Sequence, residues 1–150
     1  MTESLDVLKR TINNGGNAEE TAVIDNNNNP TRGIAATRIE GNLSMTDLPN
    51  VPGDNNTSIH SHVPLEPSVN AAGNIVYSSA LKPGPADPAA FSKFKLNIIV
   101  GRLGTQTGTA DIDGKVTFDK KPTLGAAFYR RGEIIPTLQL TIKAIEKIIK

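Results

Sequence analysis

Cysteine and tryptophan are both absent from this chain of 150 residues. The lack of cysteine excludes disulfide bonds, thiol nucleophiles and cysteine-type zinc sites, and it leaves the redox compartment open. Aromatic residues make up only 4% of the chain. Because single-stranded nucleic acid is commonly held by stacking on aromatic side chains, we expect no nucleic-acid partner.

Long apolar runs and an N-terminal signal are also lacking. No segment approaches the roughly 20 apolar residues that a helix needs to cross a bilayer. The start, MTESLDVLKR, has neither the basic region nor the apolar region of a secretory signal. We therefore expect a soluble chain with no membrane partner and no signal peptide. Its location stays open, because a cytoplasmic protein and an exported domain of a larger protein share these features.

The overall composition is that of a soluble globular protein, with 37% hydrophobic and 21% charged residues and a formal net charge of +1. The length predicts a single domain over residues 1–150. Charge is distributed unevenly: residues 1–90 carry ten acids and five bases, and residues 91–150 carry five acids and eleven bases. Two solvated faces of one domain account for this difference.

Periodicity predicts helices at both ends and short strands between them. Apolar residues at helical spacing predict helices over Thr2–Ile12 and Leu138–Ile149, and Asp87-Pro88 is typical of a helix start. Strand patterns occur at Thr21–Ile24, Ala36–Glu40, Ser58–His62, Asn74–Ser78, Leu96–Val100, Gly125–Tyr129 and Glu133–Ile135, with a hairpin over residues 110–118. The sequence thus predicts a mixed α/β (α+β) domain with a mainly antiparallel sheet.

The chain has only two histidines, and they stand as His60-Ser61-His62. On a strand, residues i and i+2 point to the same face, with alpha carbons roughly 6.5–7 Å apart. Two imidazoles placed in this way can converge on one metal ion. The alternative is a pair of half-buried histidines in a hydrogen-bonded patch.

A hydrolytic zinc site usually has three protein ligands and one position open to water. Since cysteine and a third histidine are lacking, the third ligand has to be Asp or Glu. Asp87 is the best candidate, because it follows the Gly84-Pro85 turn at a predicted helix start. The alternative role of Asp87 is to cap that helix.

These stretches together resemble a known family. The resemblance rests on His60-Ser61-His62, Pro64, residues 74–77 (NIVY), residues 84–91 and residues 97–104 (NIIVGRLG). They are similar to the JAB/MPN (JAMM) metal-dependent isopeptidases, and more closely to the JAB-like domains of bacterial polymorphic toxins. The likeness extends over residues 18–150 and is specific only at these stretches. It implies a JAB/MPN-like (cytidine-deaminase-like) fold, with a mainly antiparallel curved sheet flanked by helices.

The resemblance also implies a zinc-dependent hydrolase of amide or isopeptide bonds. In that family two histidines and an aspartate hold Zn²⁺, which here corresponds to His60, His62 and Asp87. An upstream glutamate serves as the base, and Glu20 matches it best because Glu20-Thr21-Ala22 resembles the family's glutamate and small residue. Glu19 and Glu40 are the alternatives. The implied substrate is a protein or peptide, and a toxin domain would have a cognate immunity protein and be exported within a larger toxin.

The sequence departs from the family pattern in three places. Val63 stands where proline usually follows the second histidine, and 24 residues separate His62 from Asp87, more than in the eukaryotic isopeptidases. Gly84 replaces the serine that helps to stabilise the oxyanion. This last departure keeps open a catalytically inactive MPN-type binding scaffold.

A cupin-like metal site is a third interpretation. His60-x-His62-x3-Glu66-x6-Gly73 is similar to the first cupin motif, in which two histidines and a glutamate hold a metal inside a β-barrel. Cupins usually add a later histidine, and this chain has none after His62. The predicted terminal helices also fit a barrel poorly.

Overall fold

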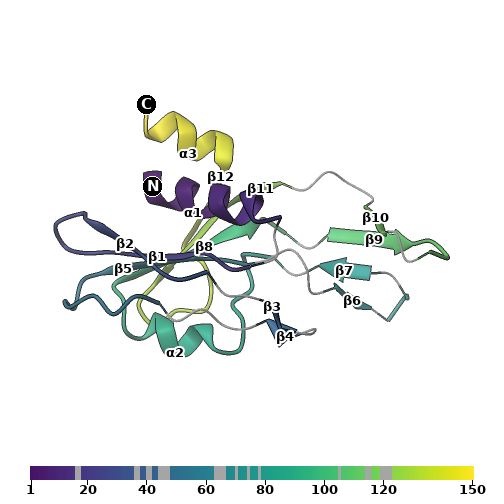
Figure 1. Cartoon of the computed structure of the whole chain (residues 1–150), viewed down its shortest axis with the longest axis horizontal. Coiled ribbons are helices and arrows are strands. Elements are labelled where there is room, and N and C mark those ends of the chain that lie inside the picture. Colours follow the sequence, from purple (N-terminus) through teal and green to yellow (C-terminus); the bar gives the residue numbers. More distant parts are fainter. Residues whose placement is uncertain are drawn as a thin grey trace.

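The computed structural model describes residues 1–15, 18–35, 38–39, 42–43, 48–62, 67–69, 71–73, 75–77, 79–104, 106–113, 116–118 and 123–150. Its elements in chain order are α1 (Thr2–Asn13), β1 (Thr21–Ile24), β2 (Pro30–Arg32), β3 (Arg38–Ile39), β4 (Asn42–Leu43), β5 (Thr57–Ser61), β6 (Pro67–Val69), β7 (Ile75–Tyr77), α2 (Asp87–Phe91), β8 (Leu96–Arg102), β9 (Gln106–Ala110), β10 (Val116–Phe118), β11 (Leu124–Arg130), β12 (Leu138–Thr141) and α3 (Ile142–Ile148). Figure 1 shows their arrangement.

A curved six-stranded sheet organises the molecule (Figure 1), with strand order β12-β11-β8-β5-β1-β2. Its neighbouring strands pair antiparallel except β5 and β8, which are parallel. Parallel neighbours need a long crossover, and the chain between β5 and β8 supplies it and carries α2. The predicted mixed α/β fold with a mostly antiparallel sheet flanked by helices is therefore confirmed.

Helices cover both faces of this sheet. Figure 1 shows α1 and α3 on one side and α2 on the other. The core under α1 and α3 consists of Leu5, Val7, Leu8, Ala22, Ile59, Ile98, Val100, Ala126, Phe128 and Ile145. The core under α2 consists of Ala80, Phe91, Ile99, Ala127 and Tyr129. Strand β8 contributes to both cores, which explains its three consecutive apolar residues Ile98, Ile99 and Val100.

The smaller sheets lie apart from the helices. Strands β10, β9, β7 and β6 form a four-stranded sheet in that order, and β3 pairs with β4. The predicted hairpin over residues 110–118 is present as the antiparallel pair β9–β10. Among the described residues, no helix is long and apolar enough to cross a membrane.

The C-terminal segment corrects two predictions. Residues 138–149 do not form one helix, because Leu138–Thr141 pairs with β11 as a strand and only Ile142–Ile148 is helical. Leu-Gln-Leu-Thr alternates with period two as well as fitting a helix, and Thr141 then caps α3 by accepting from the Ala144 N–H. Residues 133–135 lie in the turn region after β11 instead of forming a strand.

Strand β1 has a neighbour on each side in the main sheet. It pairs with Pro30–Arg32 on one side and with β5 on the other. Proline is tolerated there because β2 lies at the edge of the sheet and Pro30 is its first residue. Of the predicted strand 36–40, residues 36, 37 and 40 lie outside the described residues, and Arg38–Ile39 pairs with β4 instead of β1.

Candidate metal centre

Strand β5 directs both histidines to the α2 face of the sheet. Strands β1 and β8 flank β5, so its residues are largely buried, and His60 is only 7% exposed. The His62 N–H donates to the Val100 carbonyl at 2.9 Å, which continues the extended pairing one residue beyond the strand. The rings of His60 and His62 lie with centroids 5.2 Å apart. The prediction that the two imidazoles share one face is confirmed.

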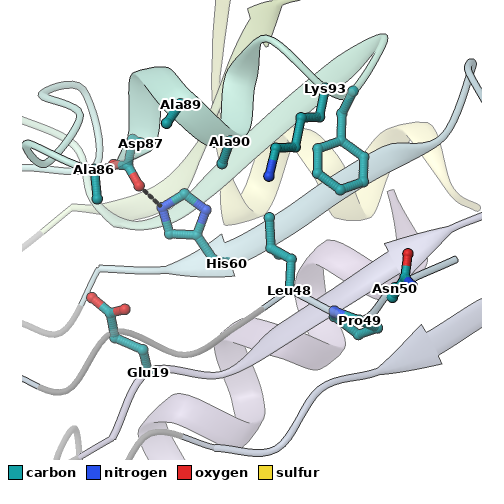
Figure 2. A pocket seen from close by; sticks show the side chains of 11 residues that line it. Glu19, Leu48, Pro49, Asn50, His60, Ala86, Asp87, Ala89, Ala90 and Lys93 are labelled. Atoms are coloured by element: carbon teal, nitrogen blue, oxygen red, sulfur yellow. Dashed lines mark ion pairs between the residues drawn. The ribbon is translucent and has the colours of Figure 1, made fainter.

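Asp87 meets the histidines from α2. It is the first residue of that helix, and Ala86 occupies the N-cap without a side-chain capping bond. One carboxylate oxygen, Oδ1, lies 3.2 Å from His60 Nε2, and the other, Oδ2, lies 3.1 Å from His62 Nε2. Figure 2 marks the contact with His60. Asp87 therefore faces the histidines, and the Gly84 N–H steadies it by donating to Oδ2 at 2.6 Å.

The spacing of these three side chains fits a metal ion. One ligand atom from each lies within 4.8 Å of the others. Ligands bound tetrahedrally at 2.0–2.1 Å are about 3.3 Å apart, close to the observed nitrogen–oxygen separations. In addition, His60 Nε2 is buried without a hydrogen-bond partner, because its contact with Oδ1 lacks hydrogen-bond alignment. A buried imidazole nitrogen beside a carboxylate oxygen brings two candidate ligand atoms together, as a cation site requires.

The electrostatics of the cluster favour a positive charge between the rings and the carboxylate. Burial opposes ionisation of Asp87, but the close contacts with the imidazoles of His60 and His62 and their charge outweigh it and hold the carboxyl pKa well below its usual range. Burial lowers the pKa of His62, but the hydrogen bond and charge of Asp87 raise it above the ordinary 6.5. In the metal-free protein a proton on His62 therefore supplies the charge that a bound cation would replace.

A backbone contact orients His62. Its Nδ1–H donates to the Ser79 carbonyl at 3.3 Å, so Nε2 is the nitrogen that faces Asp87. The Ser79 hydroxyl is used within the loop: it accepts from the N–H groups of Leu81 and Gly104 and donates to the Arg102 carbonyl. Ser79 is thus unsuited to replace the family serine, and Ser78 lies outside the described residues.

Glu20, the predicted base, points away from the histidines. Its carboxylate pairs with Arg10 and accepts from Asn14 Nδ2 at 3.1 Å, both at the end of α1. Its backbone is fixed as well, because its N–H donates to Ser61 Oγ at 2.9 Å and its carbonyl accepts from the Ser61 N–H at 3.0 Å. This placement on the α1 side argues against Glu20 as the base.

Glu19 lies on the histidine side instead. In the antiparallel pair β1–β5, Thr21 is directly opposite His60, so the two side chains share a face. Glu19 is two residues from Thr21 and falls on that face, whereas Glu20 falls on the other. Figure 2 shows the Glu19 carboxylate on the same side of His60 as Asp87, and its charge contributes to raising the pKa of His62. Glu40 lies outside the described residues.

A cavity of about 450 Å³ opens beside the cluster; we call it the α2 cavity. It is lined by Glu19, Leu48, Pro49, Asn50, His60, Ala86, Asp87, Ala89, Ala90, Lys93 and Phe94 (Figure 2). Residues 48–50 and Lys93 could not be predicted as part of the site, because nothing in their local sequence pattern indicates that they meet the histidines. A cavity of this size next to buried polar groups is typical of a ligand site.

Comparison of the chain with protein-family models, with curated proteins and with solved structures gave no match.

Proposed function

We propose that this chain is a zinc-dependent hydrolase of amide or isopeptide bonds with a JAB/MPN-like site. The observation that carries the proposal is the buried, unpartnered Nε2 of His60, which faces the Asp87 carboxylate in a cavity that Glu19 also lines. Two imidazoles and one carboxylate favour Zn²⁺ over Mg²⁺ or Ca²⁺, which take oxygen ligands almost exclusively. The sequence resemblance adds the amide or isopeptide bond as substrate.

His60, His62 and Asp87 would hold the ion. Three protein ligands are the number that catalytic zinc sites use. When bound, zinc supplies a Lewis acid and brings the pKa of a coordinated water to about 7. The protein's own part is to orient these ligands, which the Ser79 carbonyl does for His62 and the Gly84 N–H does for Asp87.

Glu19 is the proposed general base. Its carboxylate takes a proton from the attacking water, whose oxygen bonds to the substrate carbonyl carbon. The carbon–nitrogen bond then breaks, and Glu19 returns the proton to the departing amine. Arg10, Asn14 and Ser61 assist only indirectly, because they fix Glu20 and so hold its neighbour in place.

An inactive binding scaffold is the second candidate, and Gly84 favours it. Glycine has no side chain that could donate a hydrogen bond to the oxyanion, and the Gly84 N–H already donates to the Asp87 carboxylate. A cupin-like protein is not proposed, because the main sheet is open, with β12 and β2 at its edges, and Glu66 lies outside the described residues.

Metal content and cleavage together test the proposal. Purified protein incubated with zinc and desalted should retain one ion per chain, and His60→Ala, His62→Ala and Asp87→Ala should each lose it. Asp54→Ala, which alters an exposed acid away from the cluster, is the matched control and should retain zinc. Zinc-loaded protein should also cleave amide bonds in a peptide mixture analysed by mass spectrometry. Zinc retention without cleavage would favour the scaffold, and full retention in the His60 variant would exclude the site.

A further inference from the structure

The α2 cavity continues beyond the metal cluster along one face of α2. Ala86, Ala89, Ala90 and Lys93 all line it, and their spacing of three, four and seven residues places them on one side of the helix and the turn that follows. Residues 48–50 line it as well (Figure 2). The cavity is thus bounded by α2 on one side and by residues 48–50, and it opens from the metal cluster toward Lys93.

The lining has a distinct chemical character at each end. Glu19, His60 and Asp87 lie at the metal end, where the 7% exposed His60 presents its unpartnered Nε2. The middle is apolar or small, with Leu48 and the alanines of α2. Lys93 is the single cation in the lining, and Figure 2 shows its side chain reaching back from the turn after α2 toward Ala90 and Leu48. Among the described residues no carboxylate pairs with its ammonium group.

The Lys93 ammonium group and the alanine surface of α2 line the same cavity as the metal cluster. Together they fit a peptide segment that carries a negative group, because the ammonium attracts a carboxylate and the small alanine side chains leave room for a peptide backbone.

We infer that Lys93 binds a carboxylate of the substrate, so that the substrates are acidic peptides or protein segments. This inference depends on the proposed function only in treating the bound peptide as a substrate. Binding of an acidic peptide at Lys93 does not depend on it. The carboxylate belongs either to an Asp or Glu side chain or to a chain terminus. Both sources present the same group to the ammonium.

Binding measurements test the inference independently of catalysis. The probes are fluorescein-labelled alanine-rich peptides in which one Glu is moved stepwise along the chain, each with a Gln counterpart. A further pair ends in a free carboxylate or an amide. Metal-free protein should bind the best Glu or free-acid peptide about fivefold more tightly than its neutral counterpart, as an exposed ion pair allows. Lys93→Gln should remove this preference, and Lys93→Glu should invert it toward a Lys-containing peptide.

Lys95→Gln is the matched control. It removes an exposed lysine two residues away that does not line the cavity, and it should keep the preference. If Lys93→Gln loses the preference for acidic peptides and the zinc-loaded wild-type protein cleaves no peptide, the inference is supported and the hydrolase is rejected. Cleavage with equal rates for Glu and Gln peptides would reject the inference and support the hydrolase. Equal binding of all peptides by the wild-type protein would overturn the inference outright.

Discussion

Thr21 of β1 lies directly opposite His60 of β5, and this register decides which of two adjacent glutamates faces the candidate metal centre. Directly paired residues of antiparallel strands point to the same face of a sheet. Glu19 therefore shares a face with His60, and Glu20 turns to Arg10 on α1. The proposed roles of the two glutamates, Glu19 as general base and Glu20 as a structural partner of Arg10, follow from this one pairing.

Glu19→Gln and Glu20→Gln should consequently have opposite effects. We expect Glu19→Gln to retain one zinc per chain and to lose about 10²- to 10⁴-fold in kcat, because the amide cannot accept a proton. Glu20→Gln should keep most activity but lower the free energy of unfolding by about 1–2 kcal/mol, since it weakens a partly buried charged contact. Zinc stoichiometry, steady-state kinetics and urea titration measure these effects. A fully active Glu19→Gln enzyme would remove Glu19 from its role.

The part of the site within one strand could be predicted from sequence. His60 and His62 share a face because the strand period is two, and Asp87-Pro88 indicates a helix start whatever its tertiary surroundings. The choice between Glu19 and Glu20 could not be predicted, because it depends on how β1 pairs with β5. That register is set by packing of Ala22 and Ile59 against α1, and Ile59 is far from both glutamates in sequence.

The C-terminal error has a different cause. Leu138 and Leu140 fit a strand, while Leu138 and Ile142 fit a helix, so both periods are present in one segment. Pairing with β11 decides in favour of a strand up to Thr141. Lys93 illustrates a further limit, because its place in the α2 cavity depends on residues 48–50, which approach it only in the folded chain.

Gly84→Ser should increase the rate of hydrolysis. A Cβ at this position would contact only Asp87, at 3.5 Å from Oδ2 and 4.0 Å from Cγ, so serine fits without displacing backbone. If its hydroxyl supplies the oxyanion donor that the family resemblance implies, kcat should rise about tenfold or more. Gly84→Ala is the matched control, because it adds the Cβ without the hydroxyl. Equal rates for the two variants would show that position 84 has no such role in this chain.

Zinc affinity should fall as the pH is lowered. The pKa of His62 is raised above 6.5 by Asp87, so a proton competes with the ion as the pH drops through the neutral range. Asp87 stays ionised there because its pKa is well below its usual range. We expect the dissociation constant, measured by chelator competition, to increase up to about tenfold per pH unit below the raised pKa. A constant affinity between about pH 6 and 8 would contradict protonation of the ligand set in this range.

The stability of the metal-free protein should change with pH in the opposite direction to its zinc affinity, because of His62. A raised pKa in the folded state stabilises the fold below the unfolded pKa, and this contribution disappears as the pH rises through the folded pKa. Asp87 adds stability that is present above its unfolded pKa and is lost only in acid. Without zinc, the unfolding midpoint should therefore decrease slightly from pH 6 to 8, and zinc should remove this decrease. An unfolding midpoint that rises over this range without metal would contradict the assigned pKa directions.

Ser61→Ala should lower stability and kcat without changing zinc binding. Ser61 is fully buried between the two histidines in sequence, yet it faces the other side of the sheet and accepts the Glu20 N–H at 2.9 Å. Alanine would leave that buried N–H unpaired, at a cost of about 1–3 kcal/mol in the free energy of unfolding. Zinc stoichiometry should be unchanged because His60, His62 and Asp87 remain, whereas kcat should fall as Glu19 loses its fixed neighbour. Ser92→Ala, at an exposed serine beyond α2, should leave stability and kcat unaltered. An unchanged unfolding midpoint for Ser61→Ala would show that β1 and β5 hold the glutamates in register without the hydroxyl.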